Sequence, residues 1–557
     1  MEIIQPVFTV TRHSYLKTIS TSTTCHGSIH LDINSPINLW KDYDIAALPF
    51  NTTQLSPKTY NEKTVREYYF DGFTTVDGRV RAFLKIVENP DAIGTILYMS
   101  GENGVEADMV EKLYSLGYSV ALLDYMGKSD DLSRYTLYPQ SLSSCNRRST
   151  MEFESTSDEQ LSHWYIWTCI ARRAVRFIAD LNPNKKIFAL GVGLGGSTVY
   201  KLAAFDDGLT ACATLLNILP NVIGEGNAII NYHASLDCIA YAPITKIPLF
   251  MAIASNDADG SLDEMSDLAE NTKSLRRFRI IERAFASSIK NILAELYGFF
   301  SECANGSAIK PWPSITASNS AGSLYFNIDI NRPEGEPEIE TDAQIKLFVS
   351  FCIDEAPYRN WMCIPAISLG KDKFISKINV CQNDKDIHAF ANMIYPNGDI
   401  KSSTVLTISP KSLGITARPG VGHRKIYDGS MGEDGWTTRY GGTISTVRGP
   451  FDIDGVTSDD NTIITFKPGD LLFKVSADTL LQIMICGQPQ KVNIIVHDKQ
   501  YEYSCSVDIT ETDAWQKFSL SHMNFKGQNG TLTDWSQILM LELDSETTMI
   551  VGSVLWV

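Results

Sequence analysis

The chain has 557 residues, a formal net charge of −17 and 44% apolar residues. Nucleic-acid binding requires a basic face, so this acidic balance argues against a nucleic-acid partner and favours a neutral or cationic ligand. The sequence also lacks any run approaching the roughly 20 consecutive apolar residues of a membrane helix, and we expect no membrane partner.

The eleven cysteines are scattered and form no C-x-x-C pair. Several have apolar neighbours, as Cys212 and Cys486 do, which is typical of buried free thiols. The first residues lack a basic segment followed by a long apolar run, so they are not an intact signal peptide. We expect a cytoplasmic protein, or a secreted one whose signal is absent from this sequence. No motif indicates a cofactor or a metal, and we expect neither.

The first 63 residues are rich in Ser and Thr, and we interpret them as a lead-in that packs on the next domain. Two strand-like runs follow at 65–70 and 80–86. The turn signal V-D-G-R at Val76–Arg79 separates them. This pattern predicts a β-hairpin at the start of a domain that spans 64–310.

Short apolar runs alternate with helical patterns from about 94 to 302. A representative helical stretch is 163–181, H-W-Y-I-W-T-C-I-A-R-R-A-V-R-F-I-A-D-L. Apolar strands separated by helices indicate a buried parallel sheet. The predicted strands cover 95–99, 119–124, 186–190, 210–216 and 248–254.

The pattern changes after residue 305. Pro311, Pro313 and the polar residues through Ser320 predict an exposed linker. Strand-like runs separated by Gly, Asn and Asp follow, with an exposed turn at 333–337 and a second break near 414–422. We therefore predict two β-sandwich-like domains, an Ig-like one at 320–413 and a jelly-roll one at 414–557.

Residues 187–200 read I-F-A-L-G-V-G-L-G-G-S-T-V-Y, an apolar run, a glycine-rich turn and a helical stretch. This is the outline of a nucleophile elbow, G-x-S-x-G, in which a strained turn presents a serine. Gly193 stands where the serine belongs. If the turn is an elbow, Gly193 should have a positive φ, and Gly191 and Gly195 should make contacts too close for a Cβ atom.

Residues 64–302 resemble the α/β-hydrolase family, especially its acetyl xylan esterase, cephalosporin-C deacetylase and dienelactone hydrolase-like members. The resemblance is carried by the opening hairpin and the elbow, together with three stretches between them: T-I-L-Y-M-S-G-E-N-G (95–104), L-Y-S-L-G-Y-S-V-A-L-L-D-Y-M-G-K-S-D (113–130) and the helix at 165–175. It implies an α/β-hydrolase fold. It also implies that Gly101 and Glu102 lie on a loop that donates an oxyanion-hole amide, and that Leu194 contacts the substrate.

The resemblance can be tested against the catalytic triad, which in this fold follows the order nucleophile, acid, base. Asp257, in S-N-D-A-D-G-S with Asp259, fits the acid, although a solvated turn is the alternative. The histidine base should follow near 277–288, but the sequence has none between His233 and His388. His233 precedes the acid and is expected to be structural. Asp257 is thus a vestigial acid and Gly193 a degenerate nucleophile position.

Two other interpretations of the turn remain open. Ser197 could supply the missing hydroxyl, but it lies about one helical turn, roughly 5–6 Å, deeper than the elbow tip. Gly191, Gly193 and Gly196 also match the dinucleotide fingerprint G-x-G-x-x-G. That fingerprint needs an acidic residue after the next strand, where this sequence has Asn217, and it belongs on the first strand of its unit.

The last strands resemble those of jelly-roll, galactose-binding-like or carbohydrate-binding modules, in which aromatic rings stack on sugars. Trp436, in G-E-D-G-W-T-T-R-Y-G-G, lies in a glycine-rich loop and is the predicted platform. Trp515 and Trp556 lie in strand-like alternation and are expected in the core, whereas Trp535 could be either. Asp459 and Asp460 are interpreted as a solvated turn rather than as a Ca²⁺ site.

Three functions follow. The first is a hydrolase-derived, non-catalytic protein that binds a carbohydrate or an acylated small ligand. The second is an active carboxyl-ester hydrolase of the carbohydrate-deacetylase type with an unrecognised nucleophile. The third is an interaction protein whose pocket is closed. A dinucleotide-binding protein is a further alternative.

Overall fold

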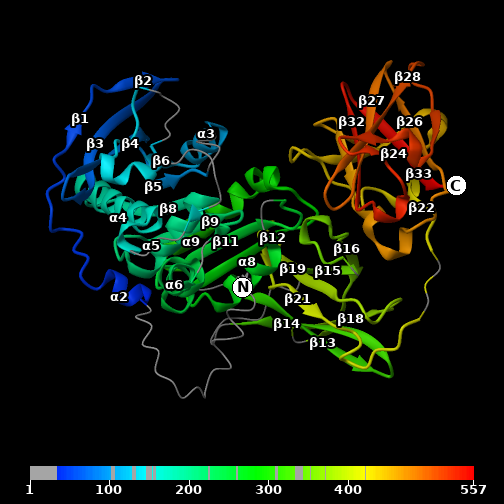
Figure 1. Ribbon diagram of the computed structural model, residues 1–557, viewed down its shortest axis with the longest axis horizontal. Coiled ribbons are helices and arrows are strands. Elements are labelled where there is room, and N and C mark those ends of the chain that lie inside the picture. Colours follow the sequence, from blue (N-terminus) through cyan, green and yellow to red (C-terminus); the bar gives the residue numbers. More distant parts are fainter. Residues whose placement is uncertain are drawn as a thin grey trace, which may run out of the picture.

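The computed structural model describes residues 34–101, 107–127, 133–145, 153–154, 159–223, 226–258, 261–307, 311–332, 343–351, 353–370, 372–418, 420 and 422–557. A mixed α/β part, the hydrolase-like unit (residues 36–305), is followed by two all-β parts (Figure 1). We call these the first β unit (312–408) and the second β unit (422–557). Residues 1–33 of the predicted lead-in lie outside the described residues.

The hydrolase-like unit is built on a ten-stranded sheet with the order β1-β3-β4-β6-β5-β8-β9-β11-β12, in which β2 also pairs with β3. The long hairpin of β3 and β4 is antiparallel and β4 pairs antiparallel with β6, while the strands from β6 to β12 run parallel. The predicted hairpin and parallel sheet are therefore confirmed. The strands are β1 Thr53–Gln54, β2 Lys58–Tyr60, β3 Lys63–Thr75, β4 Gly78–Glu88, β5 Gly94–Met99, β6 Tyr118–Asp124, β8 Lys186–Val192, β9 Ala211–Leu215, β11 Leu249–Ala254 and β12 Leu275–Ile281.

Helices cover both faces of this sheet. One apolar cluster includes the buried faces of α4 and α5, and a second includes those of α3 and α9. Strands buried on both faces read as continuous apolar runs, and the central strands do so. The helices are α2 Pro36–Trp40, α3 Ala107–Ser115, α4 His163–Leu181, α5 Leu194–Phe205, α6 Gly226–Asn231, α7 Cys238–Tyr241, α8 Leu262–Asn271 and α9 Leu293–Asn305; two short strands, β7 Phe153–Glu154 and β10 Val222–Ile223, form a separate pair.

The described end of the lead-in is held on the hydrolase-like unit by Trp40. Its ring stacks on Tyr165 of α4 at a centroid distance of 4.5 Å. Its Nε1 donates a hydrogen bond to the hydroxyl of Tyr241 at 2.9 Å. Because Trp40 is also buried, α2 contributes to the main apolar cluster rather than forming a separate arm.

The first β unit consists of two antiparallel sheets, β13-β14-β18-β17 and β16-β15-β19-β20, with β21 paired to β19. Apolar residues of both sheets form one shared cluster, so the unit is a β-sandwich. Its strands are β13 Trp312–Ser320, β14 Ser323–Asn331, β15 Gln344–Phe351, β16 Met362–Pro365, β17 Ile367–Gly370, β18 Lys373–Ile378, β19 Ile387–Ile394, β20 Ile400–Ser402 and β21 Leu406–Ile408. The predicted turn at 333–337 lies outside the described residues.

The predicted linker at Pro311–Ser320 is wrong. Residues Trp312–Ser320 form strand β13, which pairs with β14 along its whole length. β13 is at the edge of its sheet, where a proline such as Pro313 is tolerated because half of the backbone groups need no partner strand. The polar composition of this segment reflects a half-exposed edge strand.

The second β unit is also built from antiparallel sheets, β23-β24-β33-β26-β29 with β22, and β25-β32-β27-β28-β30-β31. Inward-facing residues of both sheets form its core. The strands are β22 Lys425–Asp428, β23 Ile444–Arg448, β24 Asp454–Ser458, β25 Thr462–Thr465, β26 Leu481–Gly487, β27 Gln490–His497, β28 Glu502–Ile509, β29 Gln516–Leu520, β30 Lys526–Gly527, β31 Gly530–Thr531, β32 Met540–Ser545 and β33 Met549–Trp556.

The first β unit covers the free edge of β12. The amide of Ile280 donates to Ser402 Oγ at 2.8 Å, and Asn392 Nδ2 donates to the carbonyl oxygen of Ile280 at 3.4 Å. An uncovered edge would present unpaired backbone groups to other chains. The hydrolase-like unit and the first β unit are therefore joined by an interface that includes these hydrogen bonds.

Candidate functional site at the elbow

The turn between β8 and α5 has the geometry of a nucleophile elbow. β8 ends at Val192, α5 begins at Leu194, and Gly193 between them has φ 51° and ψ −120°. This backbone conformation is costly for residues other than glycine. The Gly193 amide donates to the carbonyl oxygen of Leu215, at the end of β9, at 2.9 Å. The prediction of a positive φ is confirmed.

The neighbouring glycines are required by close packing. A Cβ atom on Gly191 would lie 2.4 Å from the carbonyl oxygen of Gly195, and one on Gly195 would lie 2.2 Å from that of Met99. A Cβ on Gly193 would meet nothing closer than the Cα of Gly101, at 3.9 Å. The turn therefore has room for a side chain at its tip, and the constraint on Gly193 is its positive φ rather than a close contact.

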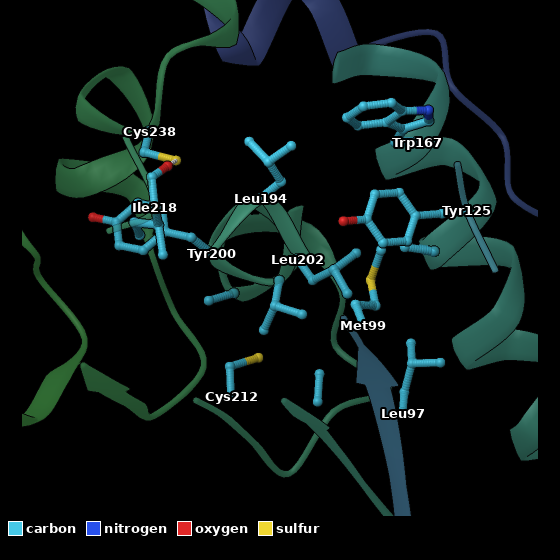
Figure 2. Close-up of a cluster of buried hydrophobic side chains, with 14 of the residues drawn as sticks. Leu97, Met99, Tyr125, Trp167, Leu194, Tyr200, Leu202, Cys212, Ile218 and Cys238 are labelled. Carbon is cyan, nitrogen blue, oxygen red and sulfur yellow. Dashed lines mark hydrogen bonds between the residues drawn. The ribbon is translucent and has the colours of Figure 1, made fainter. Parts of the chain in front are cut away.

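Gly101 and Leu194 both lie next to this tip, and their role in an oxyanion hole remains a prediction. Gly101 follows β5, and a Cβ on it would lie 3.2 Å from the carbonyl oxygen of Val192. Leu194 is 4% exposed, and its side chain belongs to the same apolar cluster as Tyr125 and Trp167 (Figure 2). A ligand at the elbow would thus meet the backbone of Leu194 rather than its side chain. Glu102 lies outside the described residues.

Asp257 lies on the same edge of the sheet as the elbow. It follows β11, and β8, β9 and β11 are neighbouring parallel strands, so their carboxyl ends meet at one edge. Asp257 is 4% exposed, so it is not part of a solvated turn. Asp259 lies outside the described residues. The role of Asp257 as a vestigial acid remains a prediction.

The segment in which the sequence predicts a histidine base, 277–288, contains a buried apolar residue. Phe285 follows β12 and is buried in a small cluster with Ile464, Phe466 and Met540 of the second β unit. Its ring centroid lies 5.8 Å from that of Phe466. The guanidinium of Arg439 stands over the Phe285 ring, 4.7 Å from its centroid. The segment that would carry a histidine is therefore part of an interface between units.

Polar contacts extend this interface to the loops after β11 and β12. Arg283, two residues before Phe285, donates from Nε to the carbonyl oxygen of Trp361 at 2.7 Å and forms an ion pair with Asp434. Next to Asp257, the side chain of Asn256 donates to the carbonyl oxygens of Pro357 and Arg359 at 3.0 and 2.9 Å. The loops after β11 and β12 are thus both fixed to the β units.

Two residues weighed as substitutes for the triad have structural partners. Nδ1 of His233 lies 2.8 Å from Asp237 Oδ2, four residues along the chain. Ser197 is 1% exposed and its Oγ accepts a hydrogen bond from Lys201 Nζ at 2.8 Å. Cys238 Sγ lies 3.3 Å from the same Oγ. Ser197 therefore lies beneath the elbow, as its helical spacing predicts.

Sequence reasoning missed Lys201, which is 1% exposed and lies under the elbow. Its ammonium stands 5.1 Å from the centroid of the Trp164 ring. The available signal was the S-x-x-x-K spacing of Ser197 and Lys201, which places both residues on one face of α5.

The predicted sugar platform at Trp436 is wrong. Trp436 is 5% exposed and belongs to the core of the second β unit, where it packs edge-on against Tyr427 at 5.2 Å. Trp535 and Trp556 are buried as well, whereas Trp515 is partly exposed. The Asp459 and Asp460 carboxylates accept hydrogen bonds from the amides of Thr443, Tyr440 and Gly442, consistent with a turn.

The topology also bears on the dinucleotide alternative. In that fold the glycine-rich turn follows the first strand of its unit, whereas here β8 follows an antiparallel hairpin and two parallel strands.

Among the described residues, no His, Cys, Asp and Glu side chains are grouped to hold a metal ion. None of the described helices is long and apolar enough to cross a membrane.

The strand order and the elbow define the class of this unit: it has the α/β-hydrolase fold. Solved structures with a similar fold include acetyl xylan esterase 1 from Thermoanaerobacterium (TM-score 0.35, 12% identity, 46% of this chain and 89% of that one) and acetyl xylan esterase from Paenibacillus sp. R4 (0.34, 12%, 46% and 89%). A third is Est1E from Butyrivibrio proteoclasticus, solved with ferulic acid. Its TM-score is 0.32 at 12% identity, and the match covers 41% of this chain and 96% of that one.

Comparison of the amino-acid sequence with known proteins does not assign the chain to a family. No family profile matches the chain, and no curated protein is similar to it in sequence. The structural similarities cover less than half of the chain. The fold assignment rests on the chain's own strand order and on the backbone of the elbow.

Proposed function

We propose that the protein is a hydrolase-derived, non-catalytic protein that binds a carbohydrate or an acylated small ligand. The observation that carries this proposal is the burial of Phe285, within the histidine-free segment after β12, against the second β unit. Acyl transfer by a triad needs a nucleophile and a base that removes its proton. Gly193 has no side chain, and the segment 277–288 contains no histidine that could act as the base.

Ligand binding is proposed from what the elbow retains. The first amides of α5 and the approach of Gly101 are the parts of such a site that stabilise a carbonyl oxygen. A neutral acylated ligand suits a chain with a net charge of −17, because an anionic ligand would be repelled at long range.

Covalent labelling tests the absence of catalysis. A fluorophosphonate probe should not label the purified full-length protein, and p-nitrophenyl acetate should be hydrolysed no faster than with heat-denatured protein. Labelling or turnover above that control would contradict the proposal.

Calorimetric titration with an acetylated xylo-oligosaccharide tests binding at the elbow, with the deacetylated oligosaccharide for comparison. Gly193→Leu should abolish binding because it fills the space beside Gly101. Gly117→Leu is the matched control, since Gly117 also has a positive φ (90°) and open space around its Cβ position. Equal losses in both variants would mean that backbone strain, rather than the elbow, is responsible.

One observation favours the second function, an active ester hydrolase. Lys201 Nζ lies 2.8 Å from Ser197 Oγ, and an amine at this distance can act as a base for a serine. Burial of both residues opposes it, since a substrate would have to reach beneath the elbow. Fluorophosphonate labelling that disappears in Ser197→Ala, but not in Ser235→Ala, would establish this function in place of the first.

A further inference from the structure

One lateral edge of the first β unit presents a row of apolar side chains to solvent. Strands β16 and β17 follow each other in the chain, and each lies at the edge of its own sheet. Within this segment, which we call the 362–370 edge, Ile364 and Ala366 pack on the core of the β-sandwich. The residues that alternate with them are exposed, namely Cys363, Pro365, Ile367 and Leu369.

The 362–370 edge lacks the charged side chains that usually protect an edge strand. Ile367 is 67% exposed and Leu369 is 62% exposed, and none of the nine residues is charged. Among the described residues, no strand pairs with the outer side of β16 or β17. An edge with apolar side chains and free backbone groups favours the addition of another strand. The described part of the chain therefore leaves this edge uncovered.

The sequence contains a segment that matches this edge in length and in pattern. Residues 3–11 read I-I-Q-P-V-F-T-V-T, nine residues that also carry no charge. Every second residue is apolar, namely Ile4, Pro6, Phe8 and Val10. β-Branched and aromatic residues predominate, as they do in strands, and a proline is tolerated in a strand at the edge of a sheet. Rows on the same face of two paired strands lie side by side, so the two apolar rows would cover each other.

Residues 3–11 are connected to the described structure by enough chain to reach this edge. They belong to residues 1–33, which precede Asn34, the first described residue. The chain between Thr11 and Asn34 spans up to about 75 Å when it is extended. A compact chain of 557 residues has a diameter of roughly 60 Å. The attachment of α2 to the hydrolase-like unit therefore does not prevent residues 3–11 from lying on the first β unit.

A second copy of the chain fits the 362–370 edge less well. Pairing of two nine-residue edges would bury far less than the roughly 1,200 Å² of a stable protein interface. Two copies with a net charge of −17 would also repel each other, whereas two acidic and two basic residues balance within 1–33. A segment of the same chain also avoids the entropy cost of bringing two molecules together.

We propose that residues 3–11 dock on the 362–370 edge as an additional strand, with their apolar row against the apolar row of the edge. The partner of this surface is thus a segment of the same chain. Because α2 is held on the hydrolase-like unit, the docked segment would tie the first β unit to it a second time, besides the contacts at β12. This inference does not depend on ligand binding at the elbow.

Hydrogen exchange of the full-length protein, measured by mass spectrometry, tests the docking from both sides. In the wild type, the amides of 7–11 should be protected from exchange by the strand pairing. Phe8→Asp should accelerate exchange of the outer amides in 366–369 by about tenfold, because a carboxylate would replace a ring in the apolar contact. Ile367→Asp should accelerate exchange in 7–11 by about the same factor, for the same reason.

Two isoleucines provide matched controls. Ile19→Asp places the same charge within 1–33 but outside the docking segment. Ile37→Asp places it on α2, at an isoleucine that is 61% exposed and thus resembles Ile367. Neither control should alter exchange in 7–11 or in 366–369.

Two results would overturn the proposal. One is rapid exchange of the 7–11 amides in the wild type, and the other is unchanged exchange in 366–369 when Phe8 is replaced. Protection of 366–369 that persists in Phe8→Asp but disappears on dilution, together with a dimer in light scattering, would assign the edge to a second copy instead. Phe8 lies outside the three described units, so Phe8→Asp keeps the test decisive if Ile367→Asp does not fold.

Discussion

The ring of Phe285 lies 5.8 Å from the ring of Phe466, centroid to centroid. Phe285 comes from the loop after the last strand of the hydrolase-fold sheet, and Phe466 comes from the second β unit, far later in the chain. In an active enzyme of this fold, the histidine base is expected in the loop after the last strand, the loop that carries Phe285 here. In this chain the loop after β12 has no histidine, and its Phe285 packs on the second β unit.

Gly193→Ser should not create an esterase. A serine fits at the tip, where a Cβ has 3.9 Å of clearance, but it has no base to remove its proton. General-base assistance contributes about 10²–10⁴-fold, so little rate would remain. Turnover of p-nitrophenyl acetate should match that of heat-denatured protein. Robust turnover by this single variant would reveal a base that the geometry of the loop after β12 does not suggest.

Adding Phe285→His to Gly193→Ser should not restore activity either. The new imidazole would be buried in the apolar cluster of Ile464, Phe466 and Met540 and beneath the Arg439 guanidinium, an environment that opposes protonation. The double variant should instead lose stability. Turnover that appears only in the double variant would show that the loop can still present a base to the elbow.

Phe285→Ala should destabilise the protein by about 3 kcal/mol, because it removes a buried aromatic ring and leaves a cavity. Phe451→Ala, at a phenylalanine that is 90% exposed, is the matched control and should change stability by less than about 0.5 kcal/mol. Urea denaturation followed by tryptophan fluorescence measures both. Equal effects would mean that the contact between the units contributes little.

Gly195→Ala and Gly193→Ala should differ strongly. A Cβ on Gly195 would lie 2.2 Å from the carbonyl oxygen of Met99, so strand and helix would have to separate, at a cost of about 3 kcal/mol. A Cβ on Gly193 meets open space, and the expected cost is the backbone strain alone, about 1 kcal/mol. In thermal unfolding, Gly195→Ala should therefore have a lower Tm than Gly193→Ala. A higher Tm for Gly195→Ala would contradict the elbow geometry.

His388 should make the protein less stable in acid. Burial, and secondarily the Arg359 guanidinium, lowers the pKa of His388 from 6.5 to about 4. The unfolded chain therefore binds more protons between these values, so stability is complete above pH 6.5 and falls as the pH drops towards 4. The loss attributable to this group is about 3 kcal/mol.

The test of the His388 prediction is a comparison of urea denaturation from pH 7.5 to 4 with His388→Gln. The substituted amide can retain a hydrogen bond to Thr407 Oγ1, which lies 2.9 Å from His388 Nδ1. The variant should lose less stability than the wild type across this range. Identical slopes of stability against pH would show that His388 is protonated in the folded protein.

Two local features of the fold could be predicted from the sequence. Apolar runs of strand length predicted β5, β6, β8, β9 and β11, because strands buried on both faces need continuous apolar residues. The glycine spacing at Gly191, Gly193 and Gly195 predicted the elbow, since close packing and a positive φ restrict residue choice at each position. Both signals can be read within a short stretch of sequence, although the contact that restricts Gly195 is with the distant Met99.

The burial of loops and edge segments could not be predicted, because it depends on which distant segments pack against them. A polar, proline-containing segment proved to be strand β13, because β14 pairs with it, and Trp436 is buried because the second β unit folds over its loop. The exposure of Phe451 and the burial of Phe285 likewise depend on which strands lie beside them. Burial is a property of three-dimensional neighbours, and the local composition of these loops is compatible with either outcome.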